Sequence, residues 1–177
     1  MFFTTKQKFI LDTLKNLNYV RRRQLHVLMR GYFQEADFEI TQASMEAMLR
    51  QLRIGTSNVR MDGELIWLHG FQPDCRRLEA IDVMIELTGG KAQNVSSKAK
   101  SPCLLRFSFG KSSDLKLFKV ASMDLPPPEL PEQSGKERVI WISDSGELPK
   151  GLVLPPKHFF AARLPDGSHR FYGSNGP

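Results

Sequence analysis

The residues best suited to catalysis in this chain are the acid-x-lysine set Asp114-Leu115-Lys116. In metal-dependent nucleases, a set of this kind on one strand works with an acidic residue on a neighbouring strand, and together they hold a divalent cation that activates water. The first acidic residue is missing here, because no Asp or Glu occurs between Glu86 and Asp114. Asp114 also follows Gly110-Lys-Ser-Ser113, which predicts a turn rather than the middle of a strand. An active nuclease with rearranged ligands is therefore the third hypothesis, behind two kinds of binding protein.

No other group of reactive residues has the spacing that catalysis, metal binding or a cofactor requires. The four histidines have no HxxxH or CxxC companion, and Cys75 and Cys103 are too far apart in sequence for a zinc motif. His26 falls in an apolar helical pattern and is expected to be packed there. Gly110-Lys111-Ser112 resembles the end of a phosphate loop, but the upstream glycine of that loop is absent. We therefore expect no catalytic residue, no metal ion and no cofactor.

Polar and basic side chains in the first third of the chain are suited to binding double-stranded DNA. Glutamine pairs with adenine edges and arginine with guanine or phosphate, and a small serine can do either. On a helix over residues 41–53, these residue types lie near the start and away from the buried face. Basic residues of a hairpin and of a second helix are placed for phosphate contacts. The expected DNA contacts are Gln42, Ser44, Arg50, Gln51, Arg60, Arg21, Arg22 and Arg23.

Three helices and a hairpin would position these contacts. Apolar residues at helical spacing predict helices over 5–17, 21–29 and 41–53. Thr41 is expected to cap the third helix, and Gly31 is expected to end the second. Two apolar runs within 58–68, joined by Asp62-Gly63, predict a hairpin with a type I′ turn. This order predicts a winged helix-turn-helix over residues 1–72, although the connection between its second and third helices is longer than a compact helix-turn-helix uses.

Residues 73–177 predict a second, helix-plus-sheet unit, so the expected fold class is α+β. A helix over 76–88 precedes strand-like runs over 103–109, 115–121, 138–142, 158–163 and 168–172. Aromatic residues and lysines alternate in these runs, which indicates a half-buried antiparallel sheet, although the same alternation can bind single-stranded nucleic acid. Residues 91–101 are expected to be loop, the Pro-rich segment 124–135 a flexible loop, and 173–177 a disordered tail. Trp67 and Phe71 are expected to be core residues.

Composition is that of a soluble protein with a mild preference for a polyanionic partner. The chain has 177 residues, a net charge of +6 and 41% hydrophobic residues, and its pI is about 9.5. No apolar run approaches the roughly 18–20 residues that span a bilayer. The N-terminus lacks the basic, apolar and small-residue order of a signal peptide. We expect a cytoplasmic protein with no membrane partner.

The N-terminal motifs resemble those of the replication-relaxation family, winged-helix proteins of bacterial plasmids and integrative elements. The similarity lies in Gln7-x-x-Ile10-Leu11, in Gln24-Leu25-x-x-Leu28, in the apolar spacing over 45–52 and in the hairpin that follows. The resemblance implies that the second half is similar to a restriction-endonuclease-like core, here degenerate because its metal ligands are incomplete. It also implies a bacterial source and a role in maintaining a plasmid or mobile element.

The favoured hypothesis is sequence-dependent binding of double-stranded DNA without catalysis, by a transcriptional regulator or a replication accessory of a plasmid or mobile element. The second unit would then form a homodimer or dock a partner. The alternative is a non-catalytic protein–protein interaction module on a winged-helix scaffold. Glu46 counts against DNA docking, because a carboxylate close to the expected DNA surface repels phosphate.

Overall fold

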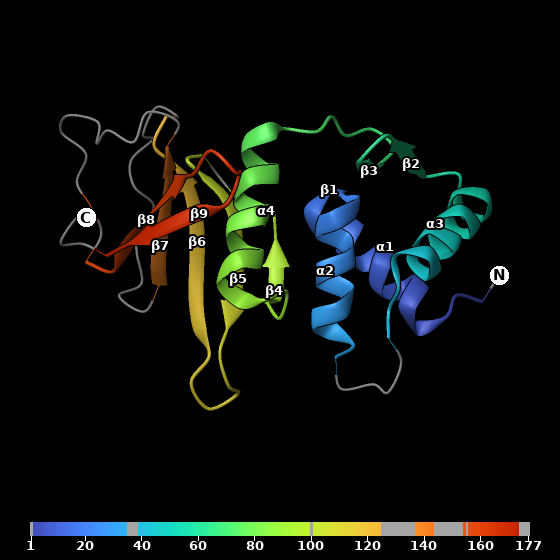
Figure 1. Ribbon diagram of the computed structural model, residues 1–177, viewed down its shortest axis with the longest axis horizontal. Coiled ribbons are helices and arrows are strands. Elements are labelled where there is room, and N and C mark those ends of the chain that lie inside the picture. The colour runs from blue at the N-terminus through green and yellow to red at the C-terminus, as the bar shows by residue number, and fades with distance from the viewer. Residues whose placement is uncertain are drawn as a thin grey trace.

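Two groups of elements follow one another along the chain in the computed structural model, which describes residues 2–34, 39–99, 101–124, 137–143, 154 and 156–173 (Figure 1). The first group is α1 (Thr5–Leu17), β1 (Tyr19–Arg21), α2 (Arg22–Tyr32), α3 (Gln42–Thr56), β2 (Val59–Asp62) and β3 (Leu65–Leu68). The second group is α4 (Cys75–Thr88), β4 (Gln93–Ser96), β5 (Cys103–Phe109), β6 (Lys116–Ser122), β7 (Glu137–Ser143), β8 (His158–Arg163) and β9 (His169–Tyr172). The described residues thus form a mixed α+β structure with four helices and two sheets.

Local capping chemistry explains where the first and third helices begin. The Thr4 hydroxyl accepts a hydrogen bond from the Gln7 amide at 3.2 Å, and the Gln7 side chain accepts one from the Thr4 amide at 3.0 Å. This reciprocal pair is a capping box, and it satisfies two amides that the first turn leaves unpaired. The Thr41 hydroxyl accepts from the Ser44 amide at 3.1 Å, so the predicted cap of α3 is confirmed.

Two predicted helix ends are wrong. α2 continues through Gly31 to Tyr32, and α3 continues to Thr56, three residues beyond its predicted end at Arg53. Gly31 has a packing role instead, because a Cβ atom on it would lie 2.4 Å from the carbonyl oxygen of Gly90. Gly31 therefore lets the backbone of α2 approach the backbone at Gly90 closely. From the sequence alone, a glycine with this packing role looks the same as a glycine that ends a helix.

The first group contains a three-stranded antiparallel sheet in the order β1-β3-β2. Asp62 pairs with Leu65, so the turn residues of the hairpin are Gly63 and Glu64 rather than Asp62 and Gly63. Gly63 takes a positive φ of 50° and Glu64 does not, which is the pattern of a type II′ turn. The predicted hairpin is confirmed. The predicted type I′ turn on Asp62-Gly63 is wrong, because the turn lies one residue later and has the type II′ pattern. β1 was not predicted from the sequence.

The second group forms a six-stranded sheet in the order β4-β5-β6-β7-β8-β9. The β6–β7 and β7–β8 pairs are parallel, so the predicted antiparallel sheet is wrong at its centre. A parallel pair needs a crossover rather than a tight turn. β4 lies within a stretch predicted as loop. The predicted loop at 124–135 and tail at 173–177 fall outside the described residues, apart from Asp124 and Gly173.

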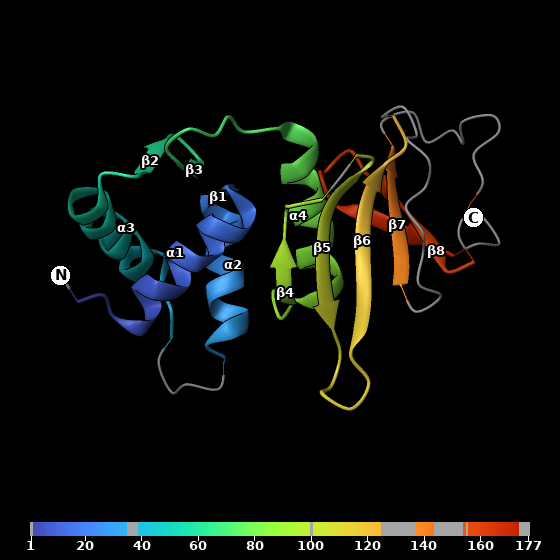
Figure 2. The same ribbon diagram turned by 180° about the vertical axis from the view of Figure 1, so that it is seen from behind.

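α4 packs against one face of the large sheet and also against α2 (Figures 1 and 2). Ile81 and Met84 of α4 belong to one buried cluster with Phe107, Val120 and Ile140 of the sheet. The same cluster continues through the helices of the first group, with buried members including Ile10, Leu25, Met45 and Ile66. Trp67 is half-buried, whereas Phe71 is 44% exposed, so the prediction of a core position is wrong for Phe71.

We expect Gly31→Ala to lower the free energy of unfolding by about 1–3 kcal/mol, because the added Cβ would force the α2 and Gly90 backbones apart. In an unhindered helix, the same substitution would raise it by about 1 kcal/mol. Urea unfolding followed by circular dichroism measures the change, and an increase in stability would contradict the packing role.

Gly90→Ala and Gly89→Ala provide a matched comparison that tests the close packing of Gly90 against α2. Both glycines have positive φ values, 81° and 61°, so both substitutions carry a similar backbone strain. Only the Gly90 Cβ would meet a neighbour, the Val27 carbonyl oxygen at 2.5 Å, and Gly89 faces open space. Gly90→Ala should therefore destabilise the protein more than Gly89→Ala.

Candidate nucleic-acid interface

The outward side of α3 is a narrow surface of small and apolar residues with one cation. Met45, Leu49 and Leu52 are fully buried. Helical spacing places four residues on the opposite side of α3, which are Ala43, Ala47, Arg50 and Ile54. Ile54 is 85% exposed. Such a surface allows a flat or grooved partner to approach the helix closely.

The α3 residues predicted to contact DNA differ in how far hydrogen bonds within the protein already engage their side chains. Gln42, Ser44, Arg50 and Gln51 are all exposed. The Ser44 hydroxyl donates to the Thr41 carbonyl at 2.8 Å and so belongs to the first turn of the helix. The Gln51 side-chain oxygen accepts from the Gln7 amide group at 2.8 Å, which ties α3 to α1.

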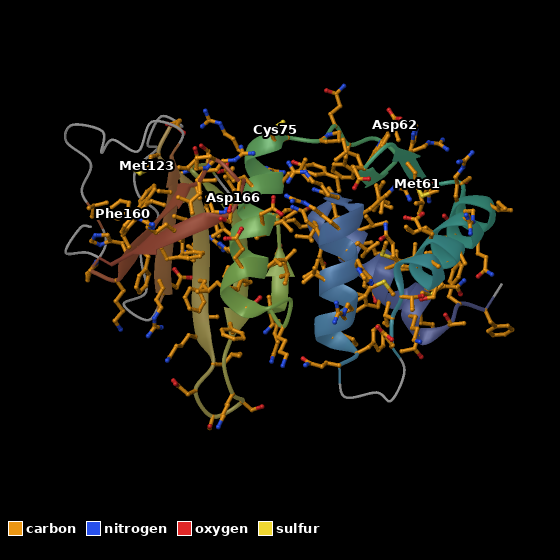
Figure 3. All side chains as sticks on the ribbon, in the orientation of Figure 1. Met61, Asp62, Cys75, Met123, Phe160 and Asp166 are labelled. Atoms are coloured by element: carbon orange, nitrogen blue, oxygen red, sulfur yellow. The ribbon has the colours of Figure 1, made fainter. Side chains whose placement is uncertain are left out.

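The hairpin lies beside α3, at the end of the molecule away from Met123, which follows β6, and from Phe160 of β8 (Figure 3). Arg60 on β2 is exposed and pairs across the strands with Trp67 of β3. Cross-strand partners lie on one face of a sheet, so the arginine and the half-buried tryptophan share a face of the hairpin. Arg60 and Arg50 are thus both exposed, one on the hairpin and one on the adjacent helix.

The arginine run at the start of α2 does not form one basic patch. The guanidinium groups of Arg21 and Arg23 lie 2.6 Å and 3.0 Å from the Asp82 carboxylate of α4. Arg22 does not contact Asp82 but forms an ion pair with Glu46 of α3. Arg21, Arg22 and Arg23, three of the predicted phosphate contacts, are therefore engaged within the protein.

Arg22 holds the hairpin turn in place. Its Nε donates to the Gly63 carbonyl at 2.6 Å, and its backbone amide donates to the Glu64 carbonyl at 2.8 Å. Its ion pair with Glu46 also compensates the carboxylate that was expected to repel phosphate. These partners lie 24 and 41 residues away from Arg22, so no local sequence pattern indicates them.

A buried polar cluster around Asp82 joins α2 to α4. Besides the two arginines, the Gln24 amide group donates to the Asp82 carboxylate at 2.9 Å and to the Leu78 carbonyl at 2.7 Å. The Asp82 side chain is 14% exposed. A carboxylate this deeply placed requires donors to offset its loss of water, and the first turn of α2 supplies them.

A second polar cluster, also missed from the sequence, joins α4 to β9. The imidazole of His169 is 1% exposed and lies between two carboxylates, Glu86 at 3.0 Å and Glu79 at 3.1 Å. Burial lowers the pKa of His169, but hydrogen bonds to the two carboxylates outweigh burial and raise the pKa overall. The hydrogen bond from His169 lowers the pKa of Glu79, against the opposing effect of burial.

Asp114 of the acid-x-lysine set lies in the turn between β5 and β6, as predicted, and Lys116 is the first residue of β6. Asp114 is exposed and forms an ion pair with Lys116 at 3.3 Å. Across the described ranges, no three or more His, Cys, Asp or Glu side chains are grouped so that they could hold a metal ion. His26 is packed, with its Nε2 at 2.8 Å from the Ile40 carbonyl.

Among the described aromatic residues of the large sheet, those at its centre are buried, whereas Phe159 of β8 and Phe171 of β9 are each 36% exposed. Phe107 and Phe118 are buried and stack on each other at 5.1 Å between ring centroids. Lys119 is also buried, and it forms an ion pair with Glu137 of the neighbouring strand. The predicted half-buried antiparallel sheet is therefore wrong at its centre, where consecutive residues of β5, β6 and β7 are buried on both faces and the β6–β7 and β7–β8 pairs are parallel.

Comparison with known proteins assigns the chain to no family: it matches no family model, no curated protein and no solved structure. In the described part of the chain, no helix combines the length and the apolar character needed to cross a membrane.

The pKa shifts of the His169 cluster predict a window of pH in which it stabilises the fold. The raised pKa of His169 means that its contribution is complete below the usual value of 6.5 and is lost as pH rises through the folded-state pKa. The lowered pKa of Glu79 means that its contribution is present above the usual value of 4.5 and is lost as pH falls through the folded-state pKa. His169→Gln should therefore weaken the loss of stability that occurs as pH rises above the usual value of 6.5.

Urea unfolding of the two proteins across this range measures the effect. His69→Gln provides the control, because His69 is exposed. Equal pH dependence in the unmodified protein and in His169→Gln would contradict a charged His169 in the folded state.

Proposed function

We propose that residues 1–72 are a winged helix-turn-helix that binds double-stranded DNA through α3 and the β2–β3 hairpin. The observation that carries the proposal is the order α1-β1-α2-α3-β2-β3 with the sheet order β1-β3-β2. In a winged helix, this arrangement leaves the third helix free on its outward side and sets the hairpin beside it. α3 would then enter the major groove and the hairpin would follow the phosphate backbone.

The side chains of α3 support a close fit to a groove. Ala43 and Ala47 leave the helix backbone accessible, and their methyl groups suit thymine methyl groups. Arg50 would contact guanine or phosphate, and Gln42 near the start of the helix would contact a base edge. Gln51 has its carbonyl oxygen engaged by Gln7, but its amide group can still donate to a base.

The hairpin supports phosphate binding through Arg60, and Arg22 supports it indirectly. Arg22 holds the Gly63 turn against α2 and α3, so the hairpin position is set before any ligand arrives. Preorganisation of this kind lowers the entropy cost of binding. Because Asp82 engages Arg21 and Arg23, we expect these two arginines to contribute less to DNA affinity than Arg50 and Arg60.

The biological setting forms part of this proposal and derives from the resemblance in the sequence. The protein would act in the bacterial cytoplasm as a transcriptional regulator or a replication accessory of a plasmid or mobile element, without catalysis. The large sheet would serve homodimer formation or partner docking.

One observation favours a second candidate, a protein-docking module on the same scaffold. Ile54 is 85% exposed on the outward side of α3, in line with Ala47 and Ala43. An exposed isoleucine gains little from a DNA groove, but it suits an apolar pocket on a protein partner.

We expect the full chain to bind labelled mixed-sequence duplex DNA, measured by fluorescence anisotropy from low to physiological salt. Arg50→Ala/Arg60→Ala should lower the affinity and reduce the slope of log K against log salt by about 2, since each lost phosphate contact contributes about 0.9. Selection from a random duplex pool should return a preferred site, because base contacts from α3 discriminate sequences.

The control for charge loss is Lys111→Ala/Arg170→Ala, which removes two exposed cations from the second group of elements. Its salt slope should match that of the unmodified protein. Absence of binding at low salt, or equal loss in the two double variants, would contradict DNA binding by α3 and the hairpin. Ile54→Asp would then test the docking candidate through loss of a captured protein partner or of self-association.

A further inference from the structure

A cleft of about 910 Å³ lies where the two groups of elements meet. Its walls are α1, the C-terminal end of α2 and the segment from Gly90 to Val95 that leads into β4. Gly31 and Gly90, whose backbones approach closely, both line it. The size and the position between two units are those of small-molecule and cofactor sites.

One wall of the cleft presents an aromatic ring to solvent. Tyr32 is 65% exposed, and its ring centroid lies 4.6 Å from that of Phe9. Phe33 contacts both rings edge-on, at 4.9 Å from Tyr32 and 5.5 Å from Phe9. Neighbouring rings thus hold Tyr32 in place while its surface stays available, as a stacking platform requires.

The charges in the cleft favour an anion. Lys8 of α1 and Lys91 of the segment after α4 both line it. Within the described part of the chain, neither lysine has a carboxylate partner. Asp12 also lines the cleft, but it forms an ion pair with Lys15 at 3.5 Å, which offsets its charge.

Amide side chains complete the lining, and they suit a ligand with both hydrogen-bond donors and acceptors. Asn16 of α1 and Gln93 and Asn94 of β4 line the cleft and are exposed, and the Asn94 amide group also donates to the Ser108 hydroxyl at 3.5 Å. An amide group can pair with a planar heterocycle through its oxygen and its nitrogen at once. An exposed aromatic ring, two free cations and several amides together match the parts of a nucleotide.

We propose that this cleft binds a nucleotide, with its base on Tyr32, its phosphate between Lys8 and Lys91, and its base edge at the amides of Asn16 and Asn94. A free nucleotide and a nucleotide within a single strand present the same chemistry. In a single strand, the neighbouring phosphates would follow the lysines out of the cleft.

This site is separate from the surface proposed for duplex DNA. The N-terminal end of α2 holds the hairpin through Arg22, and its C-terminal end carries Tyr32 into the cleft. The 11 residues of α2 set these ends about 16 Å apart at 1.5 Å per residue. Nucleotide binding in the cleft can therefore hold or fail independently of duplex binding.

The test titrates the full chain with a labelled mixed-sequence DNA single strand of about 12 nucleotides, a length that one such module can cover. ATP and GTP are titrated separately by calorimetry. Tyr32→Leu should weaken binding by about 5- to 150-fold, the range expected for the loss of one stacked base. Lys8→Gln/Lys91→Gln should reduce the single-strand salt slope by about 1.4.

Matched controls remove the same groups elsewhere. Phe71→Leu removes an exposed aromatic ring outside the cleft, and Lys111→Gln/Arg170→Gln removes two exposed cations outside it. Both should bind as the unmodified protein does. Arg50→Ala/Arg60→Ala should also keep its single-strand affinity, which separates this site from the duplex surface.

Losses of affinity confined to the cleft variants support the proposal. The ligand whose affinity falls shows whether the bound nucleotide is free or part of a single strand. Loss for the labelled strand alone indicates single-stranded nucleic acid, and loss for ATP or GTP indicates a free nucleotide. The proposal is overturned if neither ligand binds, or if Tyr32→Leu and the Lys8/Lys91 variant bind as tightly as their controls.

Discussion

The carboxylate of Asp82 joins the helical half of the chain to the sheet half. It accepts hydrogen bonds from Arg21, Arg23 and Gln24, all in or beside the first turn of α2. Because this carboxylate is largely buried, the three donors are needed to offset its desolvation, and α2 can take few other positions against α4. Arg22 in turn holds α3 through its ion pair with Glu46 and holds the hairpin through its hydrogen bond to the Gly63 carbonyl. The orientation of the proposed DNA surface relative to the sheet thus follows from one run of arginines.

The run Arg21-Arg22-Arg23 shows why three adjacent like charges do not make a binding patch. At the transition from β1 into α2, neighbouring side chains leave the backbone in different directions. Arg21 and Arg23 pair with Asp82 of α4, whereas Arg22 pairs with Glu46 of α3, so the run is divided between two parts of the protein. Arg50 and Arg60 are exposed on the proposed DNA surface, and Lys8 and Lys91 line the separate cleft. α2 connects the two surfaces, one at each of its ends.

Most helices and strands were predictable from the sequence, but the contacts that define the sites were not. The bounds of α1 are those predicted, and α4 follows its apolar run from the Asp74 cap to the left-handed Gly89, because these signals are local. The parallel centre of the large sheet depends on crossovers, which leave no local pattern. The partners of Asp82 lie 58 to 61 residues away, and the Glu86–His169 pair spans 83 residues. Gly31 was predicted to end α2 because glycine is common at helix ends. It is instead a packing contact with Gly90, which only the tertiary structure reveals.

Amide chemical-shift mapping by NMR during titration with duplex DNA tests the proposed function most directly, since a chain of 20.2 kDa is within reach of the method. We expect the shifts to gather on residues 42–56 and 59–68, the ranges of α3 and the hairpin, and to leave β5 and β6 unchanged. Shifts confined to the large sheet, or none at saturating DNA, would contradict DNA binding by the winged-helix surface.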